Sequence, residues 1–236
     1  MAKGETQAHR DLKRAALIWA QQNGYTAAGI EIRTPASRFR ADVAACKPPK
    51  NGEPGLTAVF ECKQSRSDFL KDHHALDENR ERLADLTKRR EKLERQLGVH
   101  HPSLRAGDAL FQDYESVDLS SLSHAGYQRL IRELRVVQNR IFGKTKFDRM
   151  VRWRCANLFY LVAPDGLVDV AELPEGWGML AADEEGVLQL MRKPRFVEAT
   201  AERRLELLHR IAVSGAWLRN AQQGIEGEEV FVRRQE

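Results

Sequence analysis

Residues 56–63, Leu-Thr-Ala-Val-Phe-Glu-Cys-Lys, constrain the fold of this 236-residue chain more than any other stretch. The small, β-branched and aromatic residues at its start predict a buried strand. The strand ends in Glu61 and Lys63, and because side chains alternate along a strand, these two charges point to the same face. Burying two charges costs free energy that packing alone does not return. We therefore expect a polar site at this end of the strand.

The segments before this strand predict a helix and two further strands. A helix is expected over 8–22, strands over 29–33 and 38–45, and a Pro- and Gly-rich hairpin loop over 47–55. Asp42 lies within the second of these strands. Because a hairpin loop makes its two strands neighbours, Asp42 is expected to converge with Glu61 and Lys63. Ser67 is a plausible helix N-cap, which predicts that a helix begins there.

Two charged helices with a heptad-like leucine pattern interrupt the α/β pattern. The apolar positions of the first are Leu76, Leu83, Leu86, Leu93 and Leu97, and those of the second are Leu130, Leu134, Val137 and Ile141. Helices with such stripes are expected to pack as an antiparallel pair. Residues 73–143 are therefore predicted to form an inserted coiled-coil hairpin.

The pattern of the core resumes after the insertion. Its expected elements are a basic helix over 144–155, a buried strand over 157–163, a strand pair over 176–180 and 187–191, and an amphipathic helix over 198–220. In the last helix, the side chains expected to face inward are Leu205, Leu208, Ile211, Trp217 and Leu218. The prediction is an α/β protein whose discontinuous core, residues 1–72 and 144–222, has a central sheet flanked by helices; residues 223–236 form a tail.

Composition and charge indicate which classes of protein the chain can belong to. No run of about 18 apolar residues predicts a membrane span, and the three cysteines lie far apart without zinc-site spacing. A sparse, odd number of cysteines is typical of reduced thiols in the cytoplasm. The formal net charge is +4, and the positive excess lies in the first 147 residues, which is compatible with a polyanionic partner.

Asp42 and Glu61 together indicate a metal site. Two carboxylates held close together repel each other, and both stay ionised most readily when a cation lies between them. Their oxygens suit a hard ion, Mg²⁺ or Mn²⁺. A lysine beside such a site, here Lys63, can orient a metal-bound water and stabilise charge that develops on a phosphate.

The order helix, strand, strand with Asp42 and strand ending in Glu61-Cys62-Lys63 resembles the PD-(D/E)xK nuclease superfamily. The resemblance implies a restriction-endonuclease-like core, in which Asp42 and Glu61 bind a divalent metal, the Cys62 carbonyl adds a ligand and Lys63 is the catalytic lysine. A closer resemblance is to the MmcB-like DNA-repair family. It rests on the motifs Arg40-Ala41-Asp42-Val43 and Glu61-x-Lys63-x-Ser65-x-x-Asp68-Phe69, and it covers roughly residues 8–72 and 144–195.

The chain departs from the superfamily pattern in three places. Phe39 to Ala41 stand where the superfamily is named for a proline. Many members carry an acidic residue on the first helix, which would be Glu5 or Asp11 here, although His9 stands where that residue is most expected. Glu31, on the strand before the Asp42 strand, resembles an alternative position of this acidic residue in the closer family. Glu31 is therefore predicted to be the fourth member of the metal site. The helical hairpin has no counterpart in the family pattern.

The resemblance implies a Mg²⁺-dependent deoxyribonuclease, an endonuclease or repair nuclease that hydrolyses phosphodiester bonds. The residues expected to contact DNA are Arg40, Gln64, Ser65, Lys146, Arg149 and Arg152; for the basic helix, a merely solvated face is an equal alternative. Two other functions stay open. One is a non-catalytic DNA-binding or repair-scaffold protein that retains the nuclease fold. The other is an interaction protein that forms a homodimer or binds a protein partner through the hairpin.

Overall fold

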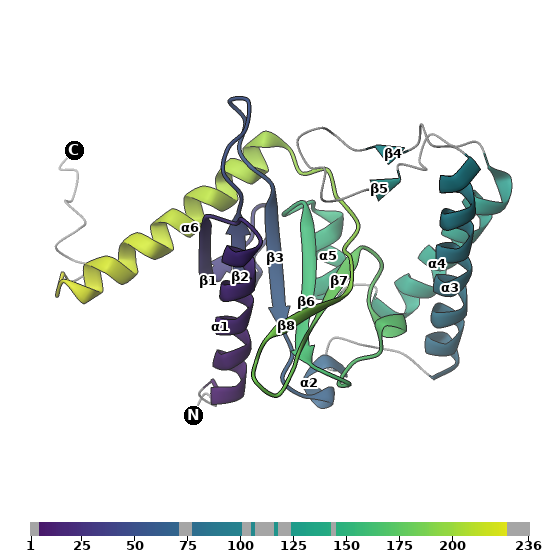
Figure 1. Cartoon of the computed structure of the whole chain (residues 1–236), viewed down its shortest axis with the longest axis horizontal. Helices are drawn as coiled ribbons and strands as arrows, with labels where there is room; N and C mark the ends of the chain where they lie inside the picture. The colour runs from purple at the N-terminus through teal and green to yellow at the C-terminus, as the bar shows by residue number, and fades with distance from the viewer. Residues whose placement is uncertain are drawn as a thin grey trace.

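The structure is a computed structural model that describes residues 5–70, 77–100, 105–106, 116–117, 124–142 and 145–225. Its centre is a six-stranded mixed sheet with helices on both faces (Figure 1). The strands are β1 (Ala27–Arg33), β2 (Arg40–Cys46), β3 (Thr57–Cys62), β6 (Leu158–Pro164), β7 (Trp177–Ala182) and β8 (Leu188–Arg192). The expected α/β class with a central mixed sheet is confirmed.

The strand order is β1-β2-β3-β6-β7-β8. The first three strands form an antiparallel meander, β3 pairs in parallel with β6, β6 pairs in parallel with β7, and β8 is an antiparallel edge strand. The predicted hairpin between the Asp42 strand and the Glu61 strand is therefore present. Because β3 and β6 lie in the middle of the sheet, all residues of β3 are buried.

Helices cover the two faces of the sheet with different parts of the sequence. The helix α1 (Gln7–Gln22) packs Leu12 and Ala16 against one face, where the rings of Phe60 and Tyr160 stack with centroids 5.1 Å apart. The helices α5 (Lys146–Arg152) and α6 (Ala201–Gln222) pack on the other face, which includes Val59. Figure 1 shows α1 in front of the sheet and α5 behind it.

The predicted helical hairpin is present and is packed against the core. Leu97 of α3 (Asp77–His100) clusters with Tyr127 of α4 (Ala125–Phe142), whereas Leu83 and Leu86 cluster with Leu134 and Val137. The early part of one helix thus meets the late part of the other, so the pair is antiparallel. Leu76 lies outside the described residues. Two short strands, β4 (Arg105–Ala106) and β5 (Ser116–Val117), pair within the segment that joins the two helices.

An ion-pair group attaches the hairpin to the core. Glu175, in the loop before β7, accepts contacts from Arg90 of α3 at 3.1 Å and from Arg195 of the segment after β8 at 3.0 Å. Arg90 is buried, and its guanidinium also lies 3.5 Å from Glu94. The hairpin is therefore held to the core by charge pairing through Glu175.

Two local expectations were wrong. The helix α2 (Arg66–Leu70) begins after Ser65, whose hydroxyl accepts a hydrogen bond from the Asp68 N–H at 3.2 Å, so Ser65 and not Ser67 is the N-cap. In α6, Ile211 is buried, but Leu205, Trp217 and Leu218 are exposed. Trp217 and Leu218 lie near the end of α6, which extends past the edge of the sheet (Figure 1). Leu205 lies in the first turns of the helix, where Leu207 is the buried leucine instead.

No helix in the described part of the chain has the length and apolar character needed to cross a membrane.

Asn157 links the central strands to the segment before α6. Its Oδ1 accepts hydrogen bonds from the N–H and the hydroxyl of Thr57, both at 3.0 Å, and its Nδ2 donates to the Val197 carbonyl at 3.1 Å. Because Asn157→Ala leaves these buried groups without partners, we expect it to lower the free energy of unfolding by about 2–4 kcal/mol, measured by chemical denaturation. The exposed control Gln189→Ala should change it by less than about 0.5 kcal/mol. Equal effects of the two variants would contradict the structural role of Asn157.

Candidate functional site

The candidate site lies where β2 and β3 separate. The last paired residues of the two strands are Val43 and Phe60. Beyond this pair, the Asp42 side chain replaces the backbone partner, because Asp42 Oδ2 accepts a hydrogen bond from the Cys62 N–H at 2.7 Å. The carboxylate of Asp42 is thus fixed beside the end of β3, next to the residue that follows Glu61.

The helix α1 brings two basic side chains to Asp42. His9 Nε2 lies 3.4 Å from Asp42 Oδ1, and Lys13 Nζ lies 3.8 Å from the same oxygen. Burial alone would raise the pKa of Asp42, but the interaction with His9 and the hydrogen bond from the Cys62 N–H outweigh it and hold this pKa below its usual value. The same contact with Asp42 raises the pKa of His9. Asp42 is therefore an ionised carboxylate in a cationic environment.

Lys13 is a buried lysine surrounded by carboxylates. Its side chain contacts Glu31 and lies 2.6 Å from Glu5. Burial by itself would lower the pKa of Lys13, but the hydrogen bonds to Glu31 and Glu5 raise it above its usual value. An ammonium group thus stands between Asp42 and Glu31. Glu31 also has a left-handed backbone, with φ of 55°, at the position that the β1–β2 register places opposite Asp42. Such a conformation is costly for a non-glycine residue.

Glu61 pairs with a lysine that lies 85 positions further along the chain. Lys146 Nζ, from the first residue of α5, donates a hydrogen bond to Glu61 Oε2 at 2.8 Å and lies 2.7 Å from Oε1. Oε1 is buried and takes part in no aligned hydrogen bond within the described residues, so the close contact with Lys146 is electrostatic at this oxygen. Burial raises the pKa of Glu61 to about 7; Lys146 lowers it and the charge of Asp42 raises it.

Lys63 faces the same helix as Glu61. Its Nζ lies 5.7 Å from the centre of the Phe147 ring, and Phe147 follows Lys146 directly in α5. The two charged ends of Glu61 and Lys63 therefore both lie against the start of α5, which confirms the expectation that they share a face. A cation over an aromatic ring is a weak stabilising contact, so it leaves the Lys63 ammonium close to the surface of the site.

The donor set of the site fits a hard divalent cation in its chemistry. Glu61 Oε1 is a buried carboxylate oxygen without an aligned hydrogen bond within the described residues. Asp42 Oδ1 is a second carboxylate oxygen, 3.4 Å from His9 Nε2, and the Cys62 carbonyl lies between Glu61 and Lys63 in sequence. Oxygen ligands of this kind suit Mg²⁺ and Mn²⁺. In the described part of the chain, however, no group of three or more His, Cys, Asp and Glu side chains is arranged to hold a metal ion. Glu31, predicted as the fourth member, is turned to Lys13 and to Arg40 instead.

Each residue predicted to contact DNA has a partner within the protein. Arg40 lies 3.5 Å from Glu31, and Lys146 contacts Glu61. Gln64 accepts a hydrogen bond from the Thr6 hydroxyl, and Ser65 caps α2. Arg149 lies 5.9 Å from the Phe39 ring centre, and Arg152 lies 3.2 Å from Asp148. Of these six residues, Lys146 contacts Glu61 and Arg40 contacts Glu31, the residue predicted as the fourth member of the metal site. The contact between Thr6 and Gln64 fixes the first turn of α1 to the end of β3.

Residue patterns did not indicate two of the side chains in the site, Lys13 and His9. Lys13 stands next to Leu12 on the apolar face of α1, and a lysine at a buried helix position is the signal that marks it. His9 stands where a carboxylate was most expected, and it contacts Asp42 instead of completing a set of acids. Both contacts depend on how α1 lies across the sheet, which residue spacing alone does not determine.

Comparisons with known proteins give a fold relationship. No protein-family model matches the chain, and no curated protein matches it. A solved structure described as the "SPO1766 protein of unknown function from Silicibacter pomeroyi" is similar, with a TM-score of 0.51 and 17% sequence identity over 95% of this chain and 97% of that chain. At this identity, the match shows a shared fold over almost the whole length of both chains.

The raised pKa of Glu61 predicts a pH-dependent stability. Because its folded-state pKa of about 7 lies above the unfolded value of 4.5, the unfolded state loses this proton first as the pH rises. Ionised Glu61 therefore destabilises the fold increasingly between pH 4.5 and pH 7. We expect the advantage of Glu61→Gln over the wild type in free energy of unfolding to grow by on the order of 3 kcal/mol between pH 4 and pH 8.

The measurement is urea denaturation at several pH values in the presence of a chelator. The control is Glu184→Gln, in the exposed turn between β7 and β8, whose difference from the wild type should stay constant with pH. A constant difference for Glu61→Gln as well would show that Glu61 ionises normally in the folded protein.

The contact between His9 and Asp42 predicts a shift in titration. Since Asp42 raises the pKa of His9, Asp42→Asn should lower this pKa toward its usual value of about 6.5. The pKa is measured by NMR titration of the imidazole protons, assigned by comparison with His9→Gln. Asp11→Asn changes an exposed acid of the same helix and should leave the titration of His9 in place. An unchanged pKa in Asp42→Asn would rule out the pairing.

Proposed function

We propose that this protein is a divalent-metal-dependent DNA nuclease that hydrolyses phosphodiester bonds with Mg²⁺ or Mn²⁺. The observation that carries the proposal is the pair of carboxylates at the end of β3. Asp42 is held by the Cys62 N–H, and Glu61 is buried with an oxygen that has no aligned hydrogen bond. The restriction-endonuclease-like order of elements and the Glu61-Cys62-Lys63 motif support it.

The ligands of the metal would be Asp42, Glu61 and the Cys62 carbonyl. When bound, a divalent cation of this class lowers the pKa of a coordinated water and neutralises charge on a phosphoryl oxygen. Asp42 is prepared for this role because its pKa is lowered, so it is ionised at neutral pH. Glu61 is half ionised near pH 7 in the absence of a cation. A cation bound between the two carboxylates would therefore complete the ionisation of Glu61 at neutral pH.

The basic side chains have separate tasks in this proposal. Lys63, against Phe147, positions the attacking water and stabilises charge on the phosphate. Lys146 neutralises Glu61 and keeps the buried carboxylate compatible with folding. His9 and Lys13 keep Asp42 ionised and fixed against the end of β3. The exposed bases Arg40 and Arg152 are suited to contact the DNA backbone, since phosphate contacts come mainly from arginine and lysine.

The test is cleavage of single-stranded, duplex and branched DNA with and without Mg²⁺ or Mn²⁺. Cleavage should require the metal, and Asp42→Ala and Lys63→Ala should each lower the rate on the order of 10²-fold or more, because each removes a group that acts on the reacting atoms. Matched controls are Asp11→Asn on α1 and Lys193→Ala after β8, both exposed and remote from the carboxylates in sequence. Both controls should cleave at the wild-type rate.

Two results would contradict the proposal. Cleavage that persists in Asp42→Ala and Lys63→Ala would place the activity elsewhere or in a contaminant. The absence of cleavage on all DNA forms, from a protein with native circular dichroism, would exclude a nuclease active on these substrates.

A non-catalytic DNA-binding protein with this fold is the second candidate. The observation that favours it is Lys146, whose ammonium group lies within 2.8 Å of both oxygens of Glu61 and so occupies the position of a cation. Salt-dependent DNA binding without cleavage, unaffected by Mg²⁺ or by Asp42→Ala, would support this function over hydrolysis.

A further inference from the structure

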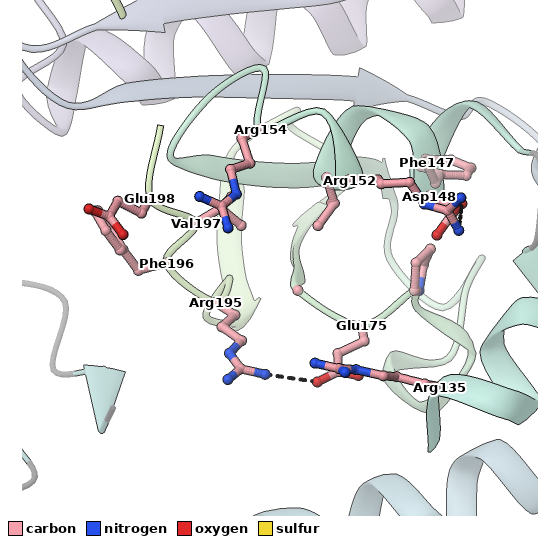
Figure 2. Close-up of a pocket in the computed structure, with 13 residues that line it drawn as sticks. Arg135, Phe147, Asp148, Arg152, Arg154, Glu175, Arg195, Phe196, Val197 and Glu198 are labelled. Carbon is pink, nitrogen blue, oxygen red and sulfur yellow. Dashed lines mark hydrogen bonds and ion pairs between the residues drawn. The ribbon is translucent and has the colours of Figure 1, made fainter. Parts of the chain in front are cut away.

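A cavity separate from the carboxylate pair lies between the core and the helical hairpin. Its volume is about 470 Å³, within the range of small-molecule sites. It is formed by α5, the loop before β7, the segment after β8 and one residue of α4 (Figure 2). It contains none of the side chains that surround Asp42 and Glu61.

The cavity has an excess of positive charge. Four arginines line it, Arg135, Arg152, Arg154 and Arg195, against three carboxylates. Arg152 is paired with Asp148 at 3.2 Å, and Arg195 with Glu175 at 3.0 Å. Two acids are thus already engaged by two of the arginines. The third, Glu198, lies at the border of the group in Figure 2, with its carboxylate directed outward.

Arg135 and Arg154 are the arginines available to a ligand. Neither makes an ion pair or hydrogen bond through its side chain within the described residues, whereas Arg152 and Arg195 do. Arg135 comes from α4 of the hairpin, and Arg154 comes from the turn after α5. Figure 2 shows the Arg154 side chain projecting from this turn toward the segment that carries Val197 and Arg195. The two guanidinium groups therefore enter the same cavity from the two parts of the molecule.

The backbone of Arg154 is unusual for an arginine. Its φ is 50°, in the left-handed region. The Arg154 N–H bonds to the Val151 carbonyl at 3.0 Å and the Cys155 N–H to the Met150 carbonyl at 3.2 Å, which is the Schellman pattern at a helix end. Glycine is the residue that favours this position, and an arginine there is strained. Such strain is often found where a side chain has a function.

The remaining walls of the cavity are apolar. They include Phe147, Val151, Pro174 and Val197. A group of apolar walls with a few converging polar side chains is typical of small-ligand sites. Arginine binds phosphate through two parallel hydrogen bonds, which adds geometric specificity to charge attraction. The cavity thus combines phosphate-binding groups with room for an uncharged part of a ligand.

We propose that this cavity binds a phosphomonoester of the size of a mononucleotide, with its phosphate on Arg154 and its uncharged part against the apolar walls and Arg135, which Figure 2 draws on the opposite side of the cavity beside Glu175. Because Arg135 belongs to the hairpin and Arg154 to the core, the ligand contacts both parts. This binding site does not depend on whether the carboxylate pair hydrolyses DNA.

The test is calorimetric titration of the full chain with inorganic phosphate, with 2′-deoxyadenosine 5′-monophosphate and with 2′-deoxyadenosine. The monophosphate should bind at least about tenfold more tightly than the nucleoside, because only it can place a phosphate on the Arg154 guanidinium. Equal affinities, or no binding of the monophosphate at millimolar concentration, would overturn the proposal.

Arg154→Gly is the decisive variant because the backbone predicts its effect on stability. Glycine suits the left-handed position, so the melting temperature should be unchanged or higher, while the affinity for the monophosphate should fall at least about tenfold. Arg135→Ala should also weaken binding, and Arg132→Ala, one helical turn earlier on α4 and outside the cavity, should not. Wild-type affinity in Arg154→Gly would overturn the proposal.

A second titration identifies the source of the phosphate. A short DNA strand with a 5′-phosphate is compared with the same strand ending in a 5′-hydroxyl. A preference of about tenfold or more for the phosphorylated strand, lost in Arg154→Gly, identifies a DNA end as the ligand. Binding of the free monophosphate without that preference identifies a free nucleotide. Either result supports the phosphomonoester site, and failure of both overturns it.

Discussion

The hydrogen bond from the Cys62 N–H to the Asp42 carboxylate is the constraint on which the candidate site depends. It takes the place of a backbone bond at the point where β2 and β3 separate, and so it joins two strands through a charged side chain. A buried carboxylate must be balanced, because an isolated charge is expensive to desolvate. The fold balances Asp42 with His9 and Lys13 of α1. Lys13 in turn contacts the carboxylates of Glu5 and Glu31, so positive and negative side chains alternate through the site.

Glu61 is balanced from the opposite face of the sheet. Its partner Lys146 follows the helical hairpin in the chain, so the site is complete only when the segments on both sides of the insertion meet. The orientation of the hairpin must therefore be compatible with the packing of α5 against β3. The contacts of Glu175 with Arg90 and Arg195 hold α3 to the core and limit the orientations of the insertion. This gives the insertion a structural relation to the site even though it supplies no carboxylate to it.

Residue patterns predicted the main features of the fold because they are local. Alternation identified β2, and a run of small, β-branched and aromatic residues identified β3. The leucine spacing identified α3 and α4, and the joining loop placed Asp42 on the strand next to Glu61. The positions of His9, Lys13 and Lys146 were not predicted as one group, since they depend on how two helices lie on opposite faces of the sheet. The exposure of Trp217 has the same origin: periodicity shows which face of α6 is apolar, but not how far the sheet extends beneath it. The nuclease activity and the metal stay predictions.

The arginine-lined cavity was beyond sequence reasoning for a related reason. Its charged side chains come from four segments, and none of them forms a motif with its neighbours. The helix α5 connects it physically to the carboxylate pair: Lys146 contacts Glu61, Phe147 lies between Lys63 and the cavity, and Arg152 lines the cavity. A helix of seven residues is only about 10 Å long, so these contacts lie close together along it. The carboxylate pair and the cavity therefore depend on the placement of the same short helix, which supplies side chains to both.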